Sequence, residues 1–208
     1  MGLIQLLFRD PLTFVLLAIP LLYSIIIHEL AHGWVAYKMG DSTAKWLGRL
    51  SLNPMRHLDP VGTLALFIVG FGWAKPVPVN FANLRDQRKG LIFVSAAGIT
   101  ANFILAFLSY FVLQFVSPVL SGRLRIMLEF MGYINIILAS FNLLPIPPLD
   151  GSKILMGFST KSFQYTLQRL EPYGMFILIG LLMIGALDRP IKIIQGIMMG
   201  IIRLLIPG

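Results

Sequence analysis

Apolar residues in this chain form long uninterrupted segments rather than the alternating or helical stripes of a soluble domain. Residues 11–37, 91–116 and 130–144 are three such segments, and the first two are long enough to cross a bilayer as helices. Residues 172–187 form a shorter predicted span, and 191–206 either span the membrane or lie in its interface. The pattern predicts an all-α polytopic membrane protein with about five transmembrane helices.

The region between the first two long segments has a different pattern. Residues 61–72 are apolar but too short to span, which predicts a re-entrant or interfacial element. Residues 75–79 follow with prolines at alternate positions, which exclude a helix and confine a strand to a sheet edge. The edge formed by Lys75, Val77 and Val79 keeps its amide donors. We therefore predict a β-hairpin element whose edge binds a hairpin partner or an extended substrate peptide.

Composition supports an integral membrane protein. The chain has 208 residues, of which 57% are hydrophobic and 12% are charged, against about 25% charged in soluble domains. We expect a single membrane-embedded domain over residues 1–208, with a catalytic core at about 11–160 and C-terminal membrane segments at 172–206. The net charge of +8 is attributed to loops beside an anionic membrane rather than to nucleic-acid binding.

The distribution of basic residues predicts the orientation in the membrane. Lys and Arg are concentrated between residues 38 and 89, in the loop that joins the first two long spans. The positive-inside rule makes this loop cytoplasmic in a multi-pass protein of the cell membrane. The residues at 145–171 then also lie on the cytoplasmic side.

Two histidines and a glutamate occur inside the first apolar segment, as His28-Glu29-Leu30-Ala31-His32. On a helix, His28 and His32 share a face and can bind one metal ion, while Glu29 can take a proton from a metal-bound water. Ionisable residues are costly at this depth, which favours a functional role. Because His28 is about 15 Å from the end of the helix at Lys38, we expect the active site nearer the cytoplasmic side.

A catalytic zinc needs a third protein ligand, and the chain has no cysteine to supply one. His57 is expected to be a solvated residue of the basic loop. Asp150 follows a proline-rich break after an apolar span, so irregular backbone directs its side chain. Its position alone leaves two readings open, a zinc ligand or the cap of a following helix.

Three motifs together resemble the site-2 protease family of intramembrane zinc metalloproteases, in a minimal form without a PDZ-like or nucleotide-sensing domain. They are HELAH at residues 28–32, GWAKPVPV at 72–79 and NLLPIPPLDG at 142–151. The resemblance implies one zinc ion per chain, with His28, His32 and Asp150 as ligands. It also implies Glu29 as the general base and Asn142 as a polar group that stabilises the oxyanion.

A fourth element of this family has a counterpart at residues 98–102, where it ends in Asn102. Asn102 is accordingly a candidate for substrate binding, with helix packing as the alternative. The implied reaction is hydrolysis of a peptide bond in or near the transmembrane segment of a protein or peptide in the bilayer. Such a reaction serves regulated intramembrane proteolysis or signal-peptide clearance, and a regulatory membrane partner is a further expectation.

Two other functions fit parts of the sequence. A membrane metal transporter could use the two histidines to bind metal in transit, but the later spans offer little besides Asp150 as a second relay site. Another HExxH membrane hydrolase, acting on lipidated substrates, would place a Glu on a later helix as its third ligand. Here the candidate third ligand is instead Asp150, in a proline-rich break.

Overall fold

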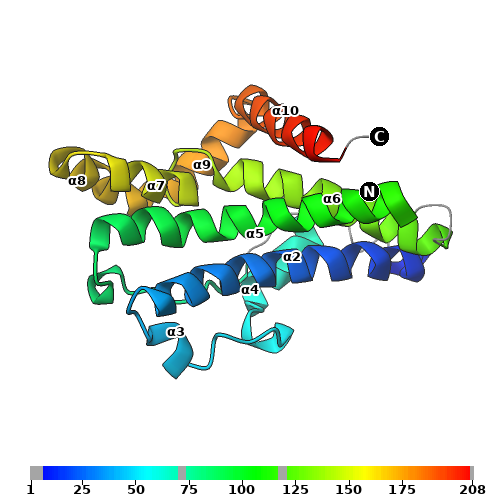
Figure 1. Ribbon diagram of the computed structural model, residues 1–208, viewed down its shortest axis with the longest axis horizontal. Coiled ribbons are helices and arrows are strands. Elements are labelled where there is room, and N and C mark those ends of the chain that lie inside the picture. The colour runs from blue at the N-terminus through cyan, green and yellow to red at the C-terminus, as the bar shows by residue number, and fades with distance from the viewer. Residues whose placement is uncertain (1–6, 70–73, 117–120, 207–208) are drawn as a thin grey trace.

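A computed structural model of the chain describes residues 7–69, 74–116 and 121–206. Three long helices, α2 (Pro11–Lys38), α5 (Gln87–Val116) and α6 (Gly122–Asn142), pack side by side along the length of the molecule (Figure 1). Each is long and apolar enough to cross a membrane. They confirm that the chain is an all-α membrane protein, and α6 begins earlier than the sequence predicted.

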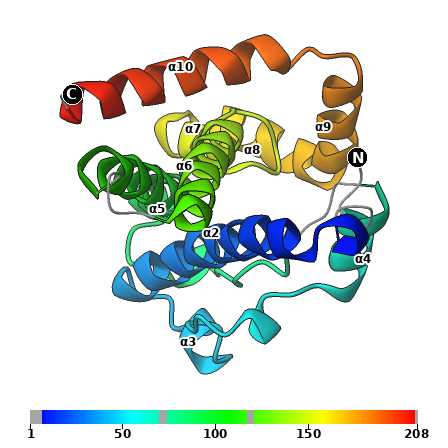
Figure 2. The ribbon, with the colours of Figure 1, turned by 90° about the vertical axis from the view of Figure 1, so that its right-hand side faces the viewer.

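Shorter elements surround these three helices. Figure 2 shows α3 and α4 on one side of the bundle and α10 on the other. The remaining helices are α3 (Thr43–Trp46), α4 (Pro60–Val69), α7 (Asp150–Phe158), α8 (Lys161–Leu170), α9 (Gly174–Met183) and α10 (Asp188–Leu205), with 3-10 turns η1 (Pro54–Arg56), η2 (Phe81–Asn83) and η4 (Glu171–Tyr173).

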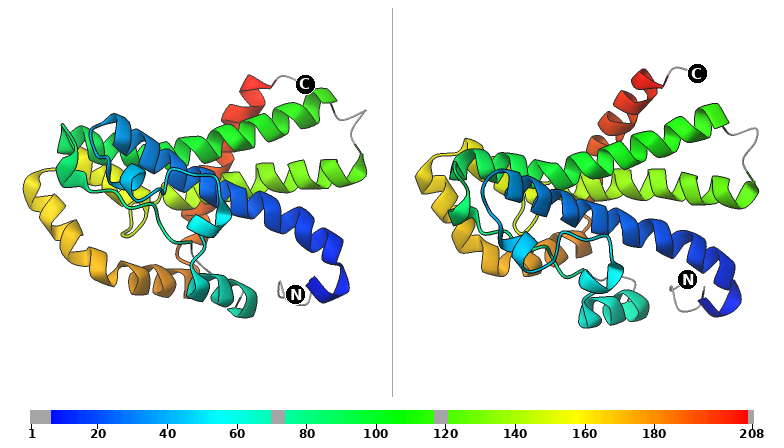
Figure 3. Two further views of the ribbon diagram at one scale, coloured as in Figure 1. Left: turned by 90° about the horizontal axis from the view of Figure 1, so that it is seen from below. Right: turned by 60° about the horizontal axis from the view of Figure 1, so that its bottom comes forward.

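The prediction of about five spans is not confirmed. Over the residues described, three helices pass as spans, or four if the bent pair 161–183 and 188–205 counts as one. The two members of this pair meet at an angle of 90°. Figures 2 and 3 show α10 lying across the bundle rather than along it. Met198 and Ile202 of α10 are buried in a core shared with α5 and α6.

The predicted hairpin after α4 is not confirmed by the residues that the structure describes. Gly72 and Trp73 lie outside the described residues, and residues 75–80 are extended but belong to no strand. The recorded pairing is a single antiparallel bridge between Leu58 and Ala74. Instead of a neighbouring strand, the Arg49 side chain binds the backbone, donating from Nη2 to the carbonyls of Lys75 (2.7 Å) and Pro76 (3.0 Å).

Helix α7 follows the proline-rich break and begins inside the protein. It packs closely against α5 and buries most of its first turn. Glycines permit this approach, because a Cβ atom at Gly157 would collide with Ile92 of α5 and one at Gly151 with the carbonyls of Leu143 and Leu144. The close packing fixes the start of α7, where Asp150 lies.

Asp41 anchors the extended segment to the end of α2. Its side chain is fully buried and accepts hydrogen bonds from the Asn80 amide (2.7 Å), the Asn83 side chain (3.0 Å) and both the amide and the hydroxyl of Thr43 (3.1 and 2.5 Å). Burial by itself would raise the pKa of Asp41, but these hydrogen bonds outweigh it and hold the pKa below its usual value. The ionised carboxylate therefore stabilises the fold.

We expect Asp41→Ala to lower the free energy of unfolding by about 3 kcal/mol at pH 7, because charge-assisted hydrogen bonds are lost and buried donors are left unpaired. The lowered pKa gives the sign of the pH dependence. The stabilisation is complete above the unfolded-state pKa of about 3.9 and disappears as the pH falls through the folded-state pKa.

Unfolding followed by circular dichroism in detergent between pH 7 and pH 3 measures this difference. Asp188→Ala, which removes an exposed carboxylate at the start of α10, is the matched control. An equal loss in both variants, or a loss for Asp41→Ala that does not shrink at low pH, would contradict the role given to Asp41.

Candidate active site

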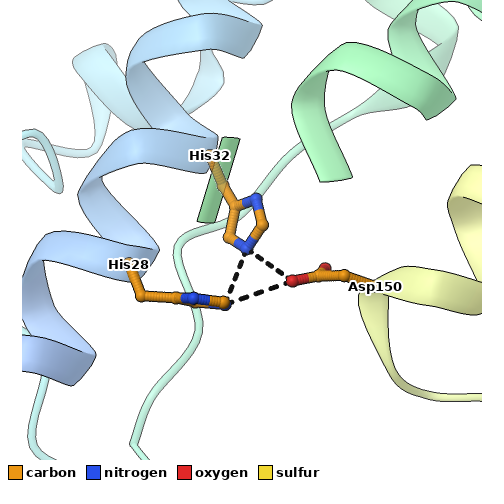
Figure 4. Close-up of side chains that lie close together, drawn as sticks. All are labelled: His28, His32 and Asp150. Carbon is orange, nitrogen blue, oxygen red and sulfur yellow. Dashed lines mark hydrogen bonds and ion pairs between the residues drawn. The ribbon is translucent and has the colours of Figure 1, made fainter. Parts of the chain in front are cut away.

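Helix α2 presents His28 and His32 on one face, and the first residue of α7 points toward them. The two imidazoles and the Asp150 carboxylate converge in Figure 4. All three residues are buried, with exposed fractions of 7%, 8% and 8%. The structure thus brings together residues from the first span and from the proline-rich break, at one depth in the bundle.

Three ligand atoms form a small triangle at the centre of this cluster. The Nε2 atoms of His28 and His32 are 3.0 Å apart, and Asp150 Oδ2 is 3.1 Å from each of them. Asp150 does not cap its helix, since the cap residue is Leu149 and no side chain caps that end. Of the two readings left open by the sequence, the structure favours the ligand.

The Nδ1 atoms of both histidines face hydrogen-bond acceptors. His32 Nδ1 lies 2.7 Å from the Val94 carbonyl oxygen, and His28 Nδ1 lies 2.5 Å from Asn102 Oδ1. A carbonyl oxygen can only accept, so Nδ1 carries the proton in each neutral ring and Nε2 presents a bare lone pair. Asp150 Oδ2 is buried and accepts no hydrogen bond of good geometry. Three lone pairs so close together repel one another unless a cation lies between them.

This donor set fits zinc. Zinc–nitrogen and zinc–oxygen bonds are about 2.0–2.1 Å long, and three atoms 3.0–3.1 Å apart can all lie at that distance from one point. Two imidazoles and one carboxylate leave a fourth position open, as catalytic zinc sites do. In the part of the chain that the structure describes, His28, His32 and Asp150 form the group of side chains that could hold a metal ion.

Gly98 of α5 forms one wall of the site. A Cβ atom at this position would lie 2.5 Å from His32 Nε2 and 2.6 Å from His28 Cε1. Any larger residue would therefore occupy the space between the imidazoles and α5. The sequence pattern at residues 98–102 did not connect Gly98 with the metal site.

Glu29 is half-buried beside His28 and faces the extended segment. Its Oε2 atom accepts a hydrogen bond of 2.8 Å from the Val77 amide. The Lys75 amide in turn donates to the His57 carbonyl at 2.8 Å. The predicted free edge of Lys75, Val77 and Val79 therefore needs correction, because two of its three amides already have partners inside the protein.

The two predicted asparagines lie in different environments. Asn142 ends α6, is half-buried, and donates to the Leu138 carbonyl of its own helix at 3.0 Å. It has no recorded contact with the three ligand side chains. Asn102 is fully buried and supports the far side of the His28 ring. That position favours a supporting role over the predicted contact with substrate.

His57 is not the solvated residue that the basic loop predicted. Its side chain is fully buried, and its Nε2 atom lies 2.7 Å from the Ser51 carbonyl oxygen. The prediction was wrong because residues 51–58 fold back on themselves through η1 and enclose the ring. His57 does not belong to the metal-binding group.

Comparison with known proteins agrees with this geometry. The sequence model of peptidase family M50 matches residues 16–122 and 119–185. The chain belongs to peptidase family M50. This is the site-2 protease family that the three sequence motifs resemble, so that expectation is confirmed.

Three relatives of this M50 member illustrate the similarity. YwhC of Bacillus subtilis is 41% identical over 168 residues, which cover 77% of each chain. Rip2 of Mycolicibacterium smegmatis is 29% identical over 184 residues, 85% of this chain and 70% of the relative. MJ0392 of Methanocaldococcus jannaschii is 28% identical over 149 residues, 72% of this chain and 36% of the relative. All three names include the words zinc metalloprotease, and no solved structure matches the M50 chain significantly.

We expect Gly98→Ala to abolish tight zinc binding by this M50 protein, because its methyl group would collide with His32 Nε2 and with His28 Cε1. Zinc content per chain after dialysis, measured by atomic emission, tests this. Gly180→Ala in α9 is the control, since a Cβ there meets nothing within 4 Å. Both changes favour a helix by up to about 1 kcal/mol, so a loss confined to Gly98→Ala identifies the clash. Normal zinc content in Gly98→Ala would contradict the geometry.

Proposed function

We propose that this protein is an intramembrane zinc metalloprotease that hydrolyses a peptide bond in or near the transmembrane segment of a membrane protein. The observation that carries the proposal is the buried triangle of two imidazole nitrogens and one carboxylate oxygen, which are 3.0–3.1 Å apart. It lies between helices long and apolar enough to cross a membrane. Membership of peptidase family M50 supports the reaction class.

In this proposal His28, His32 and Asp150 hold one zinc ion per chain. When bound, zinc lowers the pKa of a coordinated water to about 7 and polarises the substrate carbonyl. The Asp150 carboxylate partly neutralises the ion, and the two imidazoles are held by their Nδ1 hydrogen bonds to Val94 and Asn102. Three protein ligands would leave a bound zinc ion room for a water molecule or the substrate carbonyl.

Glu29 is the general base. Its Oε2 atom is held by the Val77 amide, which orients the carboxylate and leaves Oε1 to accept the proton of the attacking water. The same residue can then give this proton to the leaving amine as the peptide bond breaks. Asn142 would donate a hydrogen bond to the developing oxyanion after its amide leaves the Leu138 carbonyl.

The substrate must expose its backbone to reach this site, because a transmembrane helix shields its carbonyl groups. The extended segment that contains Lys75, Val77 and Val79 could pair with the unwound chain. In the conformation described, the Val77 amide is bound to Glu29, so pairing at that residue requires the segment to shift. Val79 is then the residue of this edge that can contact substrate first.

The membrane protein substrate and the bilayer are the partners that this function requires. The basic residues between 38 and 89 favour a cytoplasmic location for that loop in a cell membrane. The active site, about ten residues from Lys38 along α2, would then open nearer the cytoplasm. A regulatory membrane partner remains part of the proposal, and so does the organisation of residues 1–208 as one domain.

The transporter and the lipidated-substrate hydrolase are not favoured. A transporter needs further metal-binding groups along its path, and the described residues include one group that could hold a metal ion. Family M50 membership also favours a peptidase over either alternative.

Replacing the proposed general base, Glu29, distinguishes a protease from a metal transporter. We expect Glu29→Gln to bind zinc as the wild type does and to lose at least about a hundredfold in peptide cleavage, since general-base catalysis contributes 10²–10⁴ in rate. Cleavage of a reconstituted single-span substrate, followed by gel electrophoresis, gives the rate. Zinc uptake into the same proteoliposomes is the parallel measurement.

Lys153→Gln, in α7 with its amine over the Phe81 ring, is the control for a charge change near the site. Undiminished cleavage by Glu29→Gln, or zinc transport into vesicles by the wild type, would overturn the proposed function.

We expect Asn142→Ala to lower the cleavage rate by about 10²–10³, as the loss of one oxyanion donor does in other hydrolases. Zinc content should be unchanged because Asn142 contacts no ligand side chain. Single-turnover kinetics with the same substrate separate a slower chemical step from weaker binding. A full rate, or a lost rate accompanied by lost zinc, would show that Asn142 has a different role.

A further inference from the structure

A chain of buried polar side chains leads away from His28 through the membrane-spanning helices. Asn102 of α5 lies behind the imidazole, Asn135 of α6 lies behind Asn102, and Ser24 of α2 contacts Asn135. Asn102, Asn135 and Ser24 are all fully buried. None of them touches the other two ligands, so the zinc chemistry described above does not use Asn135 or Ser24.

Backbone carbonyls, which only accept, fix the direction of the hydrogen bonds that join Ser24, Asn135 and Asn102. The Ser24 hydroxyl donates to the Pro20 carbonyl at 2.6 Å, so its oxygen must accept from Asn135 Nδ2 at 2.7 Å. The same Asn135 nitrogen donates to the Met131 carbonyl at 2.8 Å. Asn135 Oδ1 therefore points toward Asn102.

The next step fixes the amide of Asn102. Its Nδ2 atom donates to Asn135 Oδ1 at 2.6 Å and to the Ser24 carbonyl at 3.4 Å. With the nitrogen held on that side, Oδ1 must face His28 Nδ1, 2.5 Å away. His28 Nδ1 consequently carries the proton, and the Nε2 lone pair points to the metal position.

We infer that Asn135 and Ser24 are positioning residues that act through Asn102 to fix the orientation and tautomer of His28. This inference rests on the proposed role of His28 as a zinc ligand. Without Asn135, the Asn102 amide could rotate by 180° and present its NH₂ group to His28. The ring would then favour a proton on Nε2, which opposes metal binding.

The two histidines differ in this respect. His32 is oriented by the Val94 carbonyl, which is backbone and fixed by α5. His28 is oriented by an amide side chain, whose two ends are nearly the same shape but opposite in hydrogen-bonding character. An amide needs a further residue to define its orientation, and Asn135 supplies it. Polar residues inside membrane-spanning helices are costly unless they are paired. Asn102, Asn135 and Ser24 meet this requirement by hydrogen bonding to one another.

The test measures metal binding rather than proteolysis. We expect Asn135→Leu, a change of similar size, to weaken zinc binding by about 10–100-fold, as the loss of an outer hydrogen bond to a zinc-bound histidine does. Zinc affinity is measured in detergent by competition with a chromophoric chelator. The visible spectrum of the cobalt(II) form reports the ligand geometry and should change in the same variant.

A double variant distinguishes positioning from a general structural role. In Asn102→Asp the carboxylate presents an acceptor to His28 in either orientation, so zinc affinity should no longer depend on Asn135. We therefore expect Asn102→Asp combined with Asn135→Leu to recover affinity to within a few fold of the wild type. Ser140→Ala, which removes a buried hydroxyl from the same helix α6, should leave affinity unchanged.

The inference is overturned if Asn135→Leu binds zinc as tightly as the wild type with the same cobalt spectrum, or if the double variant binds as weakly as Asn135→Leu. If Asn135→Leu does not fold, Asn135→Ala is measured in the same way and the same outcomes apply. Failure of the proposed function is recognised separately, because His28→Ala would then leave zinc affinity unchanged.

Discussion

The fold of this protein must hold three metal-binding atoms together between apolar helices, where unpaired polar groups are costly. Two imidazole nitrogens and a carboxylate oxygen lie 3.0–3.1 Å apart, and the protons of the two rings are on the Nδ1 atoms, away from the centre. Without a cation, such a cluster would be repulsive and costly to bury. With zinc, the same closeness becomes a rigid site for three ligands, and the packing of α2, α5 and α7 can be understood as the means of maintaining it.

Close approach of backbone makes that packing possible. Gly98 lets α5 lie against the two imidazoles, and Gly151 lets the start of α7 lie against the carbonyls that end α6. At Gly33, a Cβ would be 2.7 Å from Val77, so the extended segment can lie directly on α2 and reach Glu29. The ligands and the base are therefore positioned by contacts between helices as much as by their own sequence spacing.

The sequence predicted the parts of the site that depend on local spacing. His28 and His32 are one helical turn apart, so two ligands followed from spacing. The position of Asp150 left a ligand and a helix cap open, and the resemblance to the site-2 protease motifs is what proposed it as the third ligand. The support from Asn102 and Asn135 depends on how α5 and α6 are rotated against α2, which no local pattern defines. The presence of asparagines inside apolar spans was a usable signal. The hairpin is not confirmed over the described residues, where the Arg49 side chain binds the carbonyls of Lys75 and Pro76.

The proposed chemistry requires two histidines and one aspartate to hold a single zinc ion. X-ray absorption at the zinc edge of the purified wild-type protein tests it most directly, because multiple scattering from imidazole rings is distinctive. We expect one zinc per chain with about four nitrogen or oxygen neighbours at about 2.0–2.1 Å, two of them imidazoles. A spectrum without the contribution of two imidazoles, or one that Asp150→Ala and His32→Ala leave unchanged, would contradict it.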